Sequence, residues 1–104
     1  MSSFRLTITR AARIDIENGA EWYSFQKDDL EKDFLEEIEK TITNITLNPF
    51  QHHQILKNIR RANVNRFPFS LFFSVLGDEI KIFSVFHQNR NPLKWKEKLN
   101  DLNF

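Results

Sequence analysis

The sequence predicts a small α+β domain: an N-terminal strand, an α-helical hairpin, a three-stranded antiparallel meander and a short C-terminal helix. Apolar and polar residues alternate near the N-terminus and again in the last third of the chain, as in strands. Between these regions the apolar residues recur every three or four positions, as in helices. With 104 residues, 40% of them hydrophobic, the chain suffices for one core. We therefore expect a single domain over residues 1–104.

The first strand and the first helix are predicted by a change of period within the first 26 residues. The strand is indicated by three apolar residues at alternate positions, namely Phe4, Leu6 and Ile8. From Ala12 the apolar residues recur at helical spacing, and the pattern ends near Gln26. Gly19 is the weak point of this helix, since glycine disfavours helix interiors.

The second helix of the hairpin follows directly. Asp28 and Glu31 have the spacing of a capping box, which predicts a helix start at this position. Its apolar stripe consists of Leu30, Phe34, Leu35, Ile38, Ile42 and Ile45. Asn48 precedes Pro49, and a residue before proline disfavours the helical conformation. We expect the two helices to pair antiparallel and to cover a sheet.

The meander is predicted in the second half of the chain. The range 55–64 indicates a strand weakly, whereas Phe69 to Leu76 and Glu79 to His87 indicate strands strongly, joined by a tight turn at Gly77-Asp78. In the last strand Ile80, Ile82, Ser84 and Phe86 are expected on one face, and Lys81, Phe83 and Val85 on the other.

Composition excludes several classes of protein. The chain has no cysteine, so disulfides and thiolate sites are ruled out and a reducing cytoplasm is expected. The first ten residues lack the apolar run of a signal peptide, and no run of about 18 apolar residues predicts a membrane span. His52 and His53 are expected to face solvent, because no third ligand of suitable spacing predicts a metal site. No cofactor is expected.

Charge is segregated along the chain despite a formal net charge of +1. Residues 1–54 contain 6 Lys and Arg against 10 Asp and Glu, whereas residues 55–104 contain 9 against 4. Four cations without an acid lie within ten residues of the second half, at Lys57, Arg60, Arg61 and Arg66. This density favours a binding surface for a polyanion or an acidic partner, although exposed edge charges that discourage aggregation are the alternative.

Three segments of the second half form one pattern. They read IRRANVNRFPF from Ile59, IKIFSVFH from Ile80 and RNPLKW from Arg90. The pattern resembles the C-terminal signature of RelE/ParE toxins, which include plasmid stabilisation proteins: Arg, a spacer, Arg-Phe-Pro-Tyr/Phe, an apolar strand and Val-x-His-x-x-Arg-x-Pro-x-x-Trp. Upstream residues sit where that family places its helical hairpin, so the resemblance covers nearly the whole chain. It implies a bacterial toxin neutralised by a cognate antitoxin, without a membrane or a cofactor.

The family divides between ribosome-dependent cleavage of mRNA and poisoning of DNA gyrase. In its nuclease branch one Arg follows the aromatic that opens the third strand, a second Arg follows the fourth strand, and a Tyr lies near the C-terminus. This chain has Ser70, Gln88, and Lys94 or Trp95 at these places. The resemblance therefore favours the ParE-like branch, and enzymatic activity stays open.

Other residues can be assigned to nuclease chemistry. Cleavage through the 2′-hydroxyl needs a base, an acid and cations that stabilise the phosphorane. The candidates are Arg61, Arg66, His87 and Arg90, because imidazole titrates near neutral pH and guanidinium matches phosphate oxygens. Antiparallel pairing through the Gly77-Asp78 turn should bring Arg66, His87 and Arg90 to one end of the sheet.

Trp95 is expected to pack a short helix, Pro92 to Leu99, against the sheet, and Lys57, Arg60 and Trp95 are the candidate binding residues. The leading hypothesis is a toxin of a type II toxin-antitoxin pair that arrests growth by acting on DNA gyrase. The alternatives are a ribosome-dependent mRNA interferase and a non-toxic antitoxin-binding module.

Overall fold

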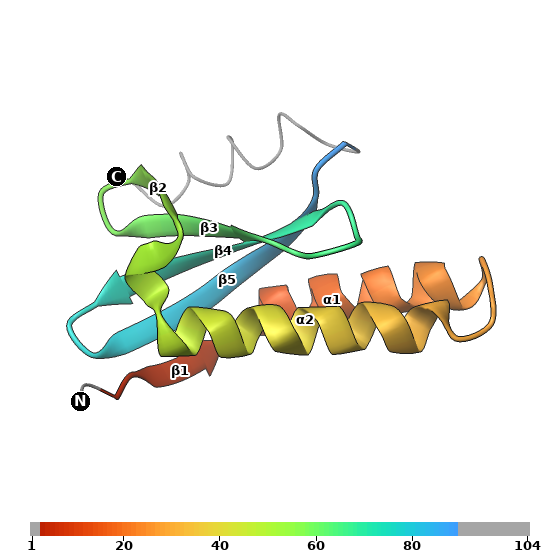
Figure 1. The fold of residues 1–104 in the computed structure, drawn as a ribbon, viewed down its shortest axis with the longest axis horizontal. Coiled ribbons are helices and arrows are strands. Elements are labelled where there is room, and N and C mark those ends of the chain that lie inside the picture. The colour runs from red at the N-terminus through yellow and green to blue at the C-terminus, as the bar shows by residue number, and fades with distance from the viewer. Residues whose placement is uncertain (1–2, 90–104) are drawn as a thin grey trace.

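Helices α1 and α2 form an antiparallel hairpin that covers one face of a five-stranded sheet in the computed structural model, which describes residues 3–89 (Figure 1). The elements in chain order are β1 (Arg5–Ile8), α1 (Arg10–Ser24), α2 (Leu30–Leu47), the 3-10 helix η1 (Pro49–Gln51), β2 (His53–Leu56), β3 (Ile59–Asn63), β4 (Phe69–Leu76) and β5 (Glu79–His87). The strand order is β1-β5-β4-β3-β2. Strand β1 runs parallel to β5, and the other neighbours are antiparallel. The predicted α+β class is confirmed, whereas the predicted helix at 92–99 lies outside the described residues.

The weak strand predicted over 55–64 is two strands, β2 and β3, which form a hairpin of their own. The chain turns at Lys57 and Asn58, and Lys57 adopts a positive φ of 44°. The side-chain amide of Gln54 donates a hydrogen bond to the Lys57 carbonyl and closes the turn. The meander therefore has four antiparallel strands in place of the predicted three. No glycine marks this turn, which is why the pattern of the sequence did not reveal it.

The predicted capping box at the start of the second helix does not form. The residue before α2 is Asp29, which has a left-handed backbone (φ 70°) and makes no side-chain capping bond. Backbone bonds close the connection: the Gln26 N–H donates to the Tyr23 carbonyl (3.1 Å) and the Leu30 N–H to the Lys27 carbonyl (3.2 Å). The end of α2 at Leu47, before Asn48 and Pro49, agrees with the prediction.

A β-bulge changes the expected alternation of the last strand. Strand β5 has nine residues against eight in β4, and Phe83 is the extra residue between the pairs Phe72↔Ser84 and Phe73↔Ile82. After the bulge, Val85 belongs to the core under the hairpin. The ring of Phe86 instead contacts Phe72, at 6.0 Å between centroids. The prediction that Phe86 shares a face with Ile80 and Ile82 was therefore wrong, because one inserted residue reverses the alternation beyond it.

Aromatic side chains fill the core between the hairpin and the sheet. Phe34 of α2 is fully buried, and its ring centroid lies 5.1 Å from Tyr23 of α1, 5.5 Å from Phe67 and 5.0 Å from Phe69 of β4. Gly19 of α1 faces the same ring, and a Cβ atom there would lie 2.8 Å from Phe34 Cζ. Gly19, the weak point of the predicted helix, thus permits the close approach of α1 and α2.

We expect Gly19→Ala to lower the free energy of unfolding by up to about 2 kcal/mol. Alanine gains about 1 kcal/mol of helix propensity, but overpacking against the buried Phe34 ring costs about 1–3 kcal/mol. Urea denaturation of both proteins measures the difference. Asn18→Ala, one position earlier on the exposed side of α1, is the control and should stabilise slightly. A Gly19→Ala protein more stable than the parent would contradict the tight helix contact.

Neither helix of residues 3–89 combines the length and the apolar character needed to cross a membrane.

Candidate functional site

The candidate site lies on the face of the sheet that points away from the hairpin, which we call the far face. Leu71 and Phe73 of β4 join the core under the helices, so their neighbours Ser70 and Phe72 point the other way. The strand pairs Arg61↔Phe72, Asn63↔Ser70 and Ser70↔Phe86 extend this face across β3, β4 and β5. The far face therefore gathers residues from three strands near the end of the sheet where β5 stops.

A small pocket of about 60 Å³ opens on the far face, lined by Arg61, Ser70, Phe72, Phe86 and Gln88. We call it the far-face pocket. Arg61 was predicted as a site residue, and Ser70 and Gln88 are two of the three places where the sequence departs from the nuclease pattern. These five residues include no carboxylate and no imidazole. The described part of its lining therefore offers one guanidinium, two rings and two neutral polar groups.

Hydrogen bonds hold the floor of the pocket in place. The Ser70 hydroxyl donates to Asn63 Oδ1 (2.7 Å), and the Gln88 side-chain amide donates to Ser70 Oγ (3.1 Å) and to the Phe69 carbonyl (3.3 Å). The Gln88 N–H donates to the Pro68 carbonyl at 2.7 Å. Gln88 is thus fixed through both its backbone and its side chain, and Ser70 is only 3% exposed. The network pre-organises neutral donors and acceptors beside Arg61.

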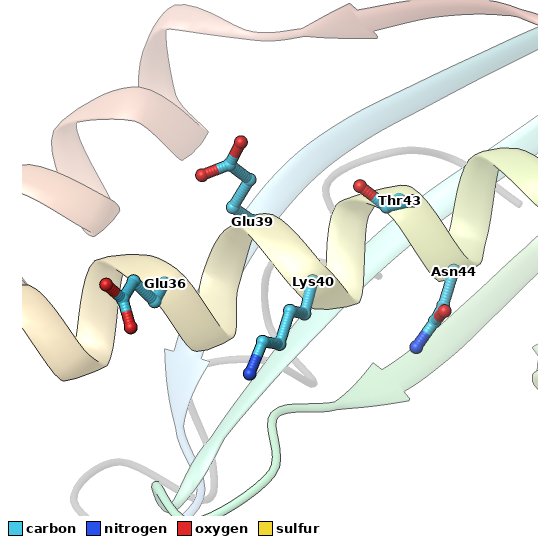
Figure 2. Close-up of a pocket in the computed structure, with 5 residues that line it drawn as sticks. All are labelled: Glu36, Glu39, Lys40, Thr43 and Asn44. Atoms are coloured by element: carbon cyan, nitrogen blue, oxygen red, sulfur yellow. The ribbon is translucent and has the colours of Figure 1, made fainter.

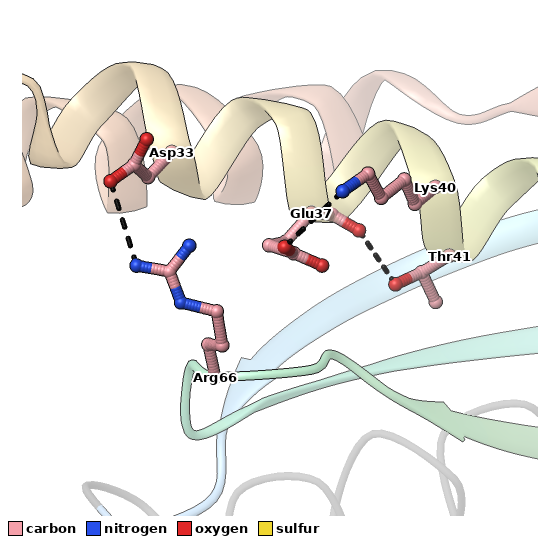
Figure 3. A network of polar contacts seen from close by, with 5 residues as sticks. All are labelled: Asp33, Glu37, Lys40, Thr41 and Arg66. Atoms are coloured by element: carbon pink, nitrogen blue, oxygen red, sulfur yellow. Dashed lines mark hydrogen bonds and ion pairs between the residues drawn. The ribbon is translucent and has the colours of Figure 1, made fainter.

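Arg66 points toward the hairpin and not into the far-face pocket (Figure 3). It lies in the loop between β3 and β4 with a left-handed backbone (φ 72°). Its guanidinium lies 3.6 Å from the Asp33 carboxylate of α2 and over the Phe67 ring, 5.7 Å from the centroid. On the same helix the buried Glu37 pairs with Lys40 at 3.6 Å. Arg66 therefore joins the loop to α2 while more than half of its side chain stays exposed.

His87 ends β5 opposite Phe69, and the two rings meet edge to face at 5.1 Å. Its Nδ1 accepts a hydrogen bond from the Asn89 N–H at 3.1 Å. The pairing places His87 at the end of the sheet away from the Gly77-Asp78 turn, where the loop of Arg66 also lies. The far-face pocket opens near this end, because Gln88 follows His87 directly. The other predicted residues, Arg90, Lys94 and Trp95, lie outside the described residues.

Arg60 and Lys57 differ from Arg61 in their surroundings. Arg60 Nη1 donates to the carbonyls of His52 (2.8 Å) and Phe50 (3.3 Å), and the guanidinium lies 5.2 Å from the Phe50 ring centroid. These bonds join β3 to η1. Lys57 occupies the turn between β2 and β3. Adjacent residues of one strand point to opposite faces, so Arg60 holds the fold together while Arg61 reaches the pocket.

The predicted exposure of the two neighbouring histidines is correct for His53 and wrong for His52. The His52 ring packs edge to face on Phe73, at 5.7 Å between centroids. Burial lowers the pKa of His52 below its ordinary value of 6.5; a hydrogen bond that the imidazole donates to the Asn44 backbone acts in the opposite direction, and the nearby Arg60 charge lowers the pKa further. Within residues 3–89 no group of three His, Asp or Glu side chains could hold a metal ion.

We expect His52 to make the protein less stable in acid. Its pKa is lower in the folded than in the unfolded chain, so the unfolded chain binds the proton first as pH falls. The stability contribution is complete above pH 6.5 and is lost as pH falls toward the folded pKa. The free energy of unfolding, measured by urea denaturation at pH 7.5 and pH 5, should therefore fall less between these two pH values in His52→Gln than in the parent. His53→Gln is the control, and an unchanged pH dependence in His52→Gln would contradict this assignment.

A second hollow, of about 490 Å³, lies along the outer surface of α2 (Figure 2). Its lining residues are Glu36, Glu39, Lys40, Thr43 and Asn44. Figure 2 shows that the two carboxylates do not point toward one another, so these residues form no converging set of ligands or catalytic groups. The far-face pocket is therefore the better candidate.

Three residues of the far-face pocket and its network were not predicted as site residues from the sequence, namely Asn63, Phe72 and Phe86. Asn63 lies two positions after Arg61 on the same strand, and this spacing would have placed it on the same face. Phe86 could not be found in this way, because the bulge at Phe83 reverses the alternation before it.

Residues 6–92 match the family model described as the ParE toxin of the type II toxin-antitoxin system parDE. A chain of the chromosomal ParDE system from P. aeruginosa is 22% identical, with a TM-score of 0.67 over 82% of this chain and 96% of that chain. A chain of the E. coli DinJ-YafQ toxin-antitoxin complex is 12% identical, with a TM-score of 0.61 over 83% and 93%. A chain of the RelBE2 complex from Mycobacterium tuberculosis is 14% identical, with a TM-score of 0.56 over 82% and 98%.

At these identities the three solved structures establish a shared fold. No curated protein matches the sequence significantly.

Proposed function

Because the chain belongs to the ParE toxin family of type II toxin-antitoxin systems, we propose that it arrests bacterial growth by acting on DNA gyrase and that a cognate antitoxin neutralises it. The neutral hydrogen-bond network of the far-face pocket favours gyrase over mRNA as the target. The nuclease branch has arginines where this chain has Ser70 and Gln88. Here the two side chains bond to each other and to neutral oxygens.

The chemical requirements of RNA cleavage also favour gyrase over mRNA as the target. A 2′-hydroxyl needs a base and the leaving oxygen needs an acid, each within hydrogen-bond reach. Among residues 3–89 the lining of the far-face pocket supplies neither, since the charged group it contributes is the guanidinium of Arg61. The ring of His87 contacts Phe69, whose side chain lies in the core under the hairpin. A surface that binds a target protein needs no base, and an arginine beside aromatic rings is typical of such surfaces.

The antitoxin is proposed from the family and from the relatives. The E. coli and Mycobacterium tuberculosis chains come from toxin-antitoxin complexes. We propose that an acidic or amphipathic segment of the antitoxin, encoded next to this chain, covers the sheet and the hairpin. The cations Lys57, Arg61 and Arg66 favour an acidic segment, and such segments commonly fold on binding.

One experiment separates the candidate targets. The chain is induced alone in a bacterium, and purified protein is added to gyrase supercoiling reactions and to translating ribosomes. Growth arrest, inhibited supercoiling and intact mRNA are expected, and co-expression of the neighbouring small reading frame should relieve the arrest. Cleaved mRNA with normal supercoiling would overturn the gyrase proposal in favour of an mRNA interferase. A complex with the antitoxin but no growth arrest would indicate a non-toxic binding module.

We expect the double variant Arg66→Ala, His87→Ala to lose growth arrest while it still folds and binds the antitoxin. Both residues lie at the end of the sheet near the far-face pocket, and we propose that they form the working surface together with Arg61. The exposed pair of Arg66 with Asp33 contributes about 1 kcal/mol or less, so stability should change little. Asp33→Asn is the control, because it removes the ion pair and keeps Arg66. Full toxicity in the folded double variant would exclude both residues from the working surface.

A further inference from the structure

We propose that Asp15 of α1 is a positioning residue for the far-face pocket: its carboxylate holds the bulge of β5 in place and thereby keeps Phe86 in the pocket. The Val85 N–H donates to Asp15 Oδ2 at 2.9 Å. Asp15 and Val85 lie 70 positions apart in the sequence. The link between the pocket and growth arrest rests on the proposed function, whereas the contact between Asp15 and the bulge does not.

The Val85 N–H needs this carboxylate because β1 is too short. Strand β1 pairs with β5 only from Glu79 to Ile82, and the last bond of this edge joins the Thr9 N–H to the Ile82 carbonyl at 2.9 Å. At this point the chain passes from β1 into helix α1, so within residues 3–89 no strand pairs with the outer edge of β5 beyond Ile82. A carboxylate from α1 satisfies the N–H that a longer β1 would have paired. An unpaired, partly buried N–H would be unfavourable.

The position of the bulge decides which side chains line the pocket. Phe83 is the extra residue of β5, and the alternation of faces reverses there. Ile80 and Ile82 before the bulge and Val85 after it all belong to the core. With the bulge moved beyond Phe86, the face of Phe86 would exchange with that of Val85. The far-face pocket would then lose the Phe86 ring, and the core would have to accommodate this ring in place of the Val85 side chain.

Other contacts anchor both ends of this segment, its inner edge pairs with β4 on both sides of the bulge, and Asp15 holds its outer edge. Ile82 is fixed by its pairing with Ile8, and Gln88 by its N–H bond to the Pro68 carbonyl at 2.7 Å. One extra residue must therefore be accommodated between two fixed points, and the register with β4 places it at Phe83. The bond from Val85 to Asp15 supports this position from the outer edge, because it holds the residue that follows Ser84 toward α1.

Asp15→Ala tests the inference against a variant that weakens the same helix elsewhere. The control is Thr9→Ala, which removes the N-terminal cap of α1, a 3.2 Å bond from the Ala12 N–H to Thr9 Oγ1. Hydrogen exchange and NMR contacts are measured on the full-length isotope-labelled chain. In Asp15→Ala the Val85 amide should exchange about tenfold faster than in Thr9→Ala. The contact between Phe72 and Phe86 should weaken in Asp15→Ala alone.

Asp15→Asn keeps an acceptor oxygen and should show intermediate exchange at Val85, with the contact of Phe72 and Phe86 retained. If Asp15→Ala does not fold, faster exchange at Val85 in Asp15→Asn than in Thr9→Ala supports the inference. Equal exchange at Val85 in the Asp15 variants and in Thr9→Ala overturns it, as does an unaltered contact between Phe72 and Phe86 in folded Asp15→Ala.

Growth arrest distinguishes this inference from the proposed function. Loss of arrest in Asp15→Ala, with recovery in Asp15→Asn, supports the positioning role and the pocket together. If Phe86 is displaced in Asp15→Ala but growth arrest is complete, the positioning role of Asp15 is supported and the pocket is not the working surface. A parent chain that causes no arrest contradicts the proposed function, while the exchange data still decide the role of Asp15.

Discussion

Replacing Phe34 with alanine is expected to lower the free energy of unfolding by about 3–5 kcal/mol, the usual cost of truncating a buried phenylalanine. The side chain is 0% exposed, and its ring contacts three others, Tyr23, Phe67 and Phe69. Truncation removes these contacts and leaves a cavity between both helices and the sheet. A small domain with a total stability of about 5–15 kcal/mol would lose much of its folded population.

Urea denaturation followed by circular dichroism measures the loss. Leu35→Ala is the matched control, since Leu35 is the next residue of α2 and 40% exposed, and it should cost about 1 kcal/mol. The double variant Gly19→Ala, Phe34→Ala should be less destabilised than the two single losses added together. The alanine at position 19 would then fill part of the cavity that the ring leaves. Equal effects of Phe34→Ala and Leu35→Ala would contradict the packing of the hairpin on the sheet.

The elements predicted best from the sequence are the two strands with the strongest local signals. The predicted bounds of β4 and β5 agree with the structure, Phe69–Leu76 and Glu79–His87. Dense β-branched and aromatic residues mark both strands, and Gly77 at a φ of 59° makes the turn between them. The end of α2 was equally predictable, since Pro49 excludes continuation of the helix.

Features that depend on distant contacts could not be predicted. The turn at Lys57 contains no glycine, and its side-chain bond from Gln54 forms only in the folded hairpin. The bulge at Phe83 depends on how β5 pairs with β4, and Val85 bonds to Asp15 from a helix far away in sequence. Side chains alternate strictly between the two faces only in a regular strand, so the sequence pattern placed Phe86 on the wrong face.

The candidate site was predictable in its location more than in its composition. Antiparallel pairing correctly implied that Arg66 and His87 share the end of the sheet away from the Gly77-Asp78 turn. The sequence could not indicate that Arg66 contacts Asp33 or that Arg60 bonds to two carbonyl oxygens. Neighbouring cations look alike in a sequence, and only the strand alternation separates Arg60 from Arg61.

Arg61→Ala is expected to abolish growth arrest with little loss of stability. Arg61 is the charged residue of the far-face pocket and lies across from Phe72 on the neighbouring strand. A hydrogen bond to a charged group contributes about 1.5–3 kcal/mol, so its loss should weaken target binding about ten- to hundredfold. Growth after induction measures arrest, and binding of the purified variant to gyrase measures affinity.

Arg60→Ala is the matched control, because it removes the same charge one position earlier on the opposite face of β3. Its guanidinium bonds to the Phe50 and His52 carbonyls, so the variant should lose about 1–2 kcal/mol of stability and still arrest growth. Arg61→Lys keeps the charge but not the planar fork, and partial arrest is expected where the target needs two parallel hydrogen bonds. Full arrest in Arg61→Ala would move the working surface away from the far face. Loss of arrest in a folded Arg60→Ala would mean that net charge, and not the position of Arg61, governs toxicity.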